Sequence, residues 1–141
     1  MKFKILMLLT LLATMAVSVA CNPEDEYLRQ LYPKESRTYA IQELKKMKDQ
    51  IVDLDEVCRK VLTLDKTPQA GMAVLAAGEL ECTMKIDRIG EIVDACMNNI
   101  NARNLKTLES AAMALGLLKQ PESVPILAKY FTIKTPERLA E

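Results

Sequence analysis

The chain has 141 residues, with 19 basic and 19 acidic side chains, no histidine and no tryptophan. The absence of histidine excludes Ser-His and Cys-His nucleophile activation and removes the commonest metal ligand. The densest basic cluster, Lys45-Lys46-x-Lys48, is flanked by Glu43 and Asp49, which is typical of a solvated helix face. Because a nucleic-acid binder gathers Lys and Arg on one face, no nucleic-acid partner is predicted.

The segment 1–20 has the composition of a secretory signal peptide. Lys2 and Lys4 precede an apolar run over 5–17, and Ser18-Val19-Ala20 places small residues before Cys21, as at a signal-peptide cleavage site. The run is shorter than the roughly 20 apolar residues that a transmembrane helix needs. Cleavage is therefore expected between Ala20 and Cys21.

Small residues directly before a cysteine resemble the lipobox of bacterial lipoproteins, although that family prefers Leu where this chain has Ser18. The resemblance implies that Cys21 becomes the lipidated first residue, with acyl chains such as palmitate that hold it in a membrane. An ordinary small-x-small cut, giving a periplasmic or secreted protein, is the alternative. The lipidated form is favoured because Asn22-Pro23-Glu24-Asp25-Glu26 is polar and turn-prone, so residues 21–35 are predicted to form a leash.

The predicted location is the bacterial cell envelope, with lipid anchoring. Asn22 after the cysteine resembles the signal for outer-membrane sorting in enteric-type bacteria, so the outer membrane is the expected site. Residues 36–141 are then predicted to form one domain, because a mature chain of about 120 residues is long enough for a single core.

The periodicity past residue 35 is helical, and no run alternates with the two-residue period of a strand. Ser36 is expected to cap the first helix, and Thr67-Pro68 places a cap and an N-terminal proline before the second. The asparagines at 98, 99 and 101 predict a loop. In chain order, the expected helices span about residues 36–64, 67–80, 86–96, 105–119 and 121–131.

The stretch AAMALGLLKQPESVPIL, residues 111–127, resembles HEAT-like helical repeats of the bilin-lyase type. The shift that places Gly116 on Gly78 also places Leu127 on Ile89, and a period of roughly 40 residues is typical of such repeats. The resemblance implies an all-α fold, a short α-solenoid of about two to three stacked antiparallel helix pairs. A generic helical bundle is the alternative. Gly116 is expected to open room for a neighbouring helix backbone.

With Cys21 assigned to the lipid, Cys58, Cys82 and Cys96 remain. The same shift puts Cys58 and Cys96 at the same position of neighbouring units, whereas Cys82 is expected about 20 Å from Cys96. A bridge between Cys58 and Cys96 is therefore the only intramolecular disulfide considered. Three reduced core cysteines are slightly preferred to it.

Catalytic, metal and cofactor motifs are not evident. No two cysteines have zinc-ligand spacing, and Asp53-x-Asp55-Glu56 departs from a calcium loop. The sequence therefore predicts a non-catalytic, lipid-anchored protein-interaction module that uses no metal or cofactor and whose protein partner it does not identify. Candidate partner contacts are Arg88, Glu91, Arg103 and Lys106. The alternative is a small-ligand carrier or enzyme subunit with an apolar pocket lined by Met72, Met84, Met97 and Met113.

Overall fold

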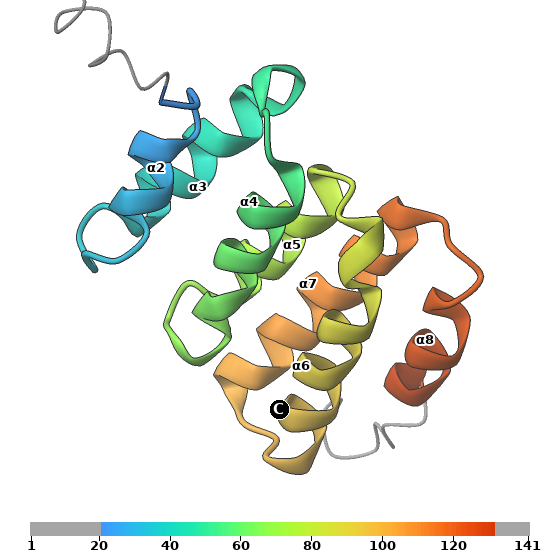
Figure 1. Cartoon of the computed structure of the whole chain (residues 1–141). Coiled ribbons are helices and arrows are strands. Elements are labelled where there is room, and N and C mark those ends of the chain that lie inside the picture. Colours follow the sequence, from blue (N-terminus) through green and yellow to red (C-terminus); the bar gives the residue numbers. More distant parts are fainter. Residues whose placement is uncertain (1–20, 132–141) are drawn as a thin grey trace, which may run out of the picture.

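A computed structural model describes residues 21–131, and within this range the protein is helical without a strand (Figure 1). The predicted all-α class is confirmed. No helix in this range has both the length and the apolar character needed to cross a membrane. The signal peptide predicted over 1–20, Ala20 included, lies outside the described residues.

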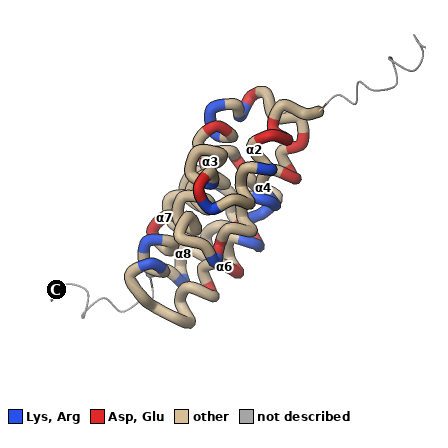
Figure 2. Tube along the Cα trace, turned by 90° about the vertical axis from the view of Figure 1, so that its left-hand side faces the viewer, with Lys and Arg blue, Asp and Glu red and all other residues tan. Residues whose placement is uncertain are grey.

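The helices form two layers. In one layer α3 contacts α5 and α5 contacts α7, while in the other α6 contacts α8. The body is elongated, with α2 and α3 at one end and α8 toward the other (Figures 1 and 2). The α-helices are α2 (Asp25–Gln30), α3 (Arg37–Lys46), α4 (Leu54–Val61), α5 (Ala70–Glu79), α6 (Ile86–Asn98), α7 (Ala102–Leu118) and α8 (Ser123–Phe131), joined by the 3-10 helices η1 (Lys48–Gln50), η2 (Leu62–Lys66) and η3 (Thr83–Lys85).

The later helices begin and end close to the predicted positions. The loop expected at the asparagines is present, and the Asn101 side chain caps α7 by accepting a hydrogen bond from the backbone N–H of Asn104 at 2.9 Å. Such a cap satisfies one of the unpaired N–H groups in the first turn of a helix. The second predicted helix starts later than expected, because Thr67 and Pro68 form a turn and α5 begins only at Ala70.

The single helix predicted over 36–64 is wrong, because α3 and α4 are separate helices. The buried carboxylate of Glu24 holds the break between them. Its Oε1 accepts hydrogen bonds from the backbone N–H groups of Val52, at 3.0 Å, and Asp53, at 2.7 Å. The Asp53 side chain then caps α4 by accepting the N–H of Glu56 at 3.0 Å. These bonds replace the intrahelical partners that a continuous helix would supply.

The polar leash predicted over 21–35 is also wrong, because most of this segment is folded. Leu28 and Leu31 are buried in the main core, and α2 packs on α3 and α4. The folded part begins at Asn22, whose N–H donates to Asp25 Oδ2 at 3.1 Å. Burial of the two leucines outweighs the polar character of the residues before them, since each buried leucine contributes about 2 kcal/mol.

We expect Glu24→Ala to lower the free energy of unfolding by about 2 kcal/mol, because it leaves two backbone N–H groups without an acceptor. Glu24→Gln is the matched control. Its amide oxygen can still accept both hydrogen bonds, so its loss should be smaller. Urea unfolding followed by circular dichroism measures both values. Equal stability of the natural protein and Glu24→Ala would contradict this role.

The contact between α5 and α7 is the most extensive between two helices of the described range, and Gly78 makes it possible. A Cβ atom added to Gly78 would lie 2.5 Å from Ala114 Cα and 2.9 Å from Ala114 O. Around Gly116 an added Cβ would meet nothing within 4 Å. The expectation that Gly116 opens room for another backbone within the chain is therefore wrong, and Gly78, its counterpart earlier in the sequence, has that role.

A disulfide joins Cys58 in α4 to Cys82, with 5.8 Å between their Cα atoms. The predicted Cys58–Cys96 bridge is wrong, and so is the preferred alternative of three reduced cysteines. The chain reverses after α5 through Glu81, whose φ is 61°, and the following segment returns beside α4. Cys96 remains free and buried, and its burial raises the pKa of its thiol, which disfavours the reactive thiolate.

Candidate interaction groove

An open groove of about 480 Å³ lies between the N-terminal halves of α5 and α7. Gly71 allows the two helices to approach closely here, because a Cβ atom there would lie 3.1 Å from Ser110 Oγ. We call this feature the α5–α7 groove. Its lining residues are Pro68, Gly71, Met72, Ala102, Arg103, Lys106, Thr107 and Ser110.

The ionisable side chains that line the α5–α7 groove are both basic. Arg103 is held in place because its Nη2 donates a hydrogen bond to the backbone oxygen of Thr67 at 2.8 Å. This bond joins segments far apart in the sequence and attaches the start of α7 to the turn before α5. The residue as a whole is exposed. The groove can therefore accept an anionic group of a partner.

A second groove of about 380 Å³ shares Arg103 with the first. It adds one more basic side chain, Lys66, and one acidic side chain, Asp65. The Asp65 carboxylate is already paired with Arg88 Nη2 at 3.2 Å. The residues that line this second groove are Asp65, Lys66, Ile92, Ala95, Cys96, Asn99, Asn101, Arg103 and Asn104.

Lys66 and Lys106 differ from most lysines of residues 21–131, because neither makes an ion pair within this range. Other lysines pair with carboxylates on a different helix or turn. These pairs are Lys45–Glu79 at 2.6 Å, Lys48–Glu81 at 3.1 Å, Lys85–Asp55 at 3.0 Å and Lys129–Asp94 at 3.0 Å. The basic cluster of Lys66, Arg103 and Lys106 thus carries positive charge that the described chain does not neutralise.

The structure brings together two of the four predicted partner contacts. Arg103 and Lys106 lie on one face of α7, as their i, i+3 spacing requires, and both line the α5–α7 groove. Arg88 and Glu91 lie on α6 and pair with each other at 2.8 Å. Arg88 also pairs with Asp65, which lines the second groove. Arg88 and Glu91 therefore lie beside the second groove and do not line the α5–α7 groove.

Sequence reasoning missed Gly71 and Lys66. Both flank the Thr67-Pro68 turn, and their relation to α7 depends on how α5 packs against it. The four methionines proposed to line one pocket are not brought together. Met72 lines the α5–α7 groove, Met84 lines a separate groove near Gln120, Met97 packs on the core, and Met113 is 60% exposed.

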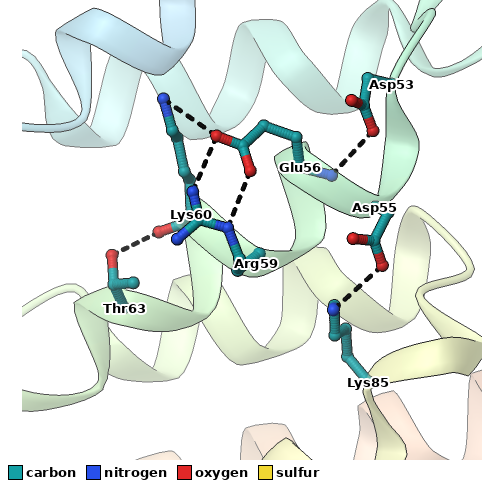
Figure 3. A network of polar contacts seen from close by, with 7 residues as sticks. All are labelled: Asp53, Asp55, Glu56, Arg59, Lys60, Thr63 and Lys85. Carbon is teal, nitrogen blue, oxygen red and sulfur yellow. Dashed lines mark hydrogen bonds and ion pairs between the residues drawn. The ribbon is translucent and has the colours of Figure 1, made fainter.

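The exposed side of α4 carries a polar network with Glu56 at its centre (Figure 3). The Glu56 carboxylate accepts hydrogen bonds from Arg59 Nε at 2.7 Å and Nη2 at 2.8 Å, and lies 3.3 Å from Lys60 Nζ. The hydrogen bonds from Arg59 lower the pKa of Glu56 from 4.5 to about 2, with a smaller contribution from Lys60. All three residues are neighbours on one helix, so the network stabilises α4.

Because the folded-state pKa of Glu56 lies below its ordinary value, its stabilising effect is present above about pH 4.5 and is lost as the pH falls toward about 2. We therefore expect Glu56→Gln to lower the melting temperature near neutral pH, and this difference from the natural protein to shrink in acid. Asp49→Asn removes the same charge from an exposed residue without an ion pair in the described range, and it should show no such convergence. A difference for Glu56→Gln that stays constant with pH would contradict the pairing.

No group of three or more Cys, Asp or Glu side chains in the described range is arranged to hold a metal ion. The features of the α5–α7 groove that could select a partner are its shape and the positive charge of Arg103 and Lys106. In comparisons with known proteins, the chain matches no family model, no curated protein and no solved structure.

Proposed function

We propose that the protein is a lipid-anchored, non-catalytic protein-interaction module of the bacterial cell envelope. The observation that carries the envelope location is the buried Cys58–Cys82 disulfide. Disulfides persist in oxidising compartments and are rare in the cytosol. This supports export by the signal peptide predicted over 1–20, with attachment of lipid to Cys21, which is exposed at the start of the folded domain.

The layered arrangement supports a short HEAT-like solenoid over a generic helical bundle. The α3–α5–α7 and α6–α8 contacts are those expected when antiparallel helix pairs stack side by side, each pair contacting its neighbours. Consecutive helices also pack on one another, with α4 against α5, α6 against α7, and α7 against α8. Such stacks present extended surfaces that bind other proteins.

The partner surface in this proposal is the α5–α7 groove with the basic cluster of Lys66, Arg103 and Lys106. Its charge fits a partner segment that carries Asp or Glu side chains, since complementary charges guide association and exclude like-charged proteins. The alternative function, a small-ligand carrier or enzyme subunit with an apolar pocket, has less support from the structure. Binding pockets for small molecules are concave and enclose most of their ligand, whereas the α5–α7 groove is open and the proposed methionine lining is dispersed.

Site-specific photo-cross-linking in intact cells tests the interaction surface. A photoreactive amino acid replaces Met72 in the α5–α7 groove or, as a control, Met84 in a separate groove. We expect a discrete cross-linked product at Met72 that is weakened about tenfold or more by Arg103→Glu with Lys106→Glu. Equal products at both positions would contradict the assignment.

Lys34→Glu with Lys119→Glu is the matched charge control. Both lysines are exposed and make no ion pair within the described range, so this pair changes the net charge by the same amount away from the groove. The Met72 product should survive it. Loss of that product in both charge-reversed proteins would indicate an effect of net charge and would argue against a specific groove.

A further inference from the structure

The folded domain begins so close to Cys21 that little chain separates the two. Glu24 is only 1% exposed and is fixed by its hydrogen bonds to Val52 and Asp53. The extended chain from Cys21 to Glu24 spans at most about 11 Å. A lipid on Cys21 would therefore hold Glu24, and with it the turn between α3 and α4, next to the bilayer surface.

The side chains that surround this attachment point include exposed apolar and aromatic groups. Val52, whose backbone N–H is bonded to Glu24, is 67% exposed. Tyr39 on α3 is also exposed and packs edge-on against Tyr27, with ring centroids 6.1 Å apart. Tyrosine is enriched where membrane proteins meet lipid headgroups, because its ring is apolar and its hydroxyl is polar.

We propose that this end of the molecule, defined by Val52 and Tyr39, is a membrane-contact surface that rests on the headgroups of the bilayer that holds Cys21. The inference rests on the proposed function, because it requires the lipid on Cys21. It fixes an orientation, since α2 and α3 lie at one end of the elongated body and α8 toward the other (Figures 1 and 2). The α7–α8 end is then the part presented away from the membrane.

The short connection and the apolar side chains, and not electrostatic attraction, determine this contact. Exposed charges near the surface are of both signs, with Glu26 and Arg29 on α2. Salt screens attraction between exposed charges and anionic lipids over about 10 Å at about 0.1 M. The contact should therefore form on zwitterionic vesicles and persist at high salt.

The absence of tryptophan from the chain makes a direct test possible. Val52→Trp places the only tryptophan at the proposed surface, and Met113→Trp places it on α7, where the residue is 60% exposed. Each full-length lipidated protein is incorporated into phosphatidylcholine vesicles that contain lipids brominated near the headgroup. We expect the Val52→Trp fluorescence to lose most of its intensity and the Met113→Trp fluorescence to keep it, at low and at high salt.

Intact mass separates failure of this inference from failure of the proposed function. A protein without lipid on Cys21 would overturn the anchored module, and the surface with it. A lipidated protein whose Val52→Trp is not quenched, or whose two tryptophans are quenched equally, would overturn the surface alone. Tyr39→Trp, checked for helical content by circular dichroism, repeats the measurement on the same surface and should be quenched as Val52→Trp is.

Discussion

Replacing Gly78 with alanine is expected to lower the free energy of unfolding by about 3 kcal/mol, at the upper end of what overpacking in a core usually costs. The added Cβ would lie 2.5 Å from the Cα and 2.8 Å from the Cβ of Ala114. These atoms belong to the backbone of α7 or lie directly on it, so no flexible side chain can move aside. The two helices would have to separate along their most extensive contact.

Gly116→Ala is the matched control and should have the opposite sign. Gly116 is the counterpart of Gly78 on α7, is exposed, and has nothing within 4 Å of an added Cβ. Alanine favours a helix over glycine by up to about 1 kcal/mol, so this variant should be slightly more stable than the natural protein. Urea unfolding of the three proteins measures both differences. A destabilised Gly116→Ala and an unchanged Gly78→Ala would contradict the packing described.

The second large effect is expected from removal of the disulfide. The bridge closes a loop with a sequence separation of 24, and a loop of this size contributes about 3 kcal/mol in the chain-entropy model. We therefore expect Cys58→Ala with Cys82→Ala to lose about that amount. Dithiothreitol should lower the unfolding midpoint of the natural protein and leave the double variant unchanged.

Cys96→Ala controls for the effect of losing a buried thiol. Cys96 is free in the structure, so its replacement should leave the response to dithiothreitol intact. Alkylation before and after reduction, read by mass spectrometry, identifies the paired cysteines. A bridge that contains Cys96, or an unfolding midpoint that does not respond to reductant, would contradict the assignment.

Local signals were sufficient for α6, α7 and α8. Their apolar periodicity, the Asn101 cap and the proline-containing turn before α8 each act over a short stretch of chain, and the structure has these helices close to where they were expected. The break between α3 and α4 could not be found in this way. The apolar spacing continues through it, and the residue that stabilises it, Glu24, is 28 positions before Val52.

The disulfide and the basic cluster could not be predicted for the same reason, because each is formed by residues that are far apart in the sequence and are brought together by helix packing. Cys82 approaches Cys58 only because the chain reverses at Glu81, whose backbone is in the left-handed region that non-glycine residues rarely adopt. Arg103 and Lys106 could be grouped from their spacing on one helix. Lys66 joins them because α5 packs against α7 through Gly78, which the sequence shows only as a glycine in an alanine-rich segment.

The central claim is that the domain is attached to a membrane through Cys21. Intact mass spectrometry of the mature protein, extracted from the membrane fraction of its natural host, tests it most directly, with Cys21→Ser as the control. We expect the chain to begin at Cys21 with a diacylglyceryl or triacyl mass on that residue, and we expect the variant to lose both the lipid and the membrane association. A soluble natural protein that begins at an unmodified Cys21 would contradict the account.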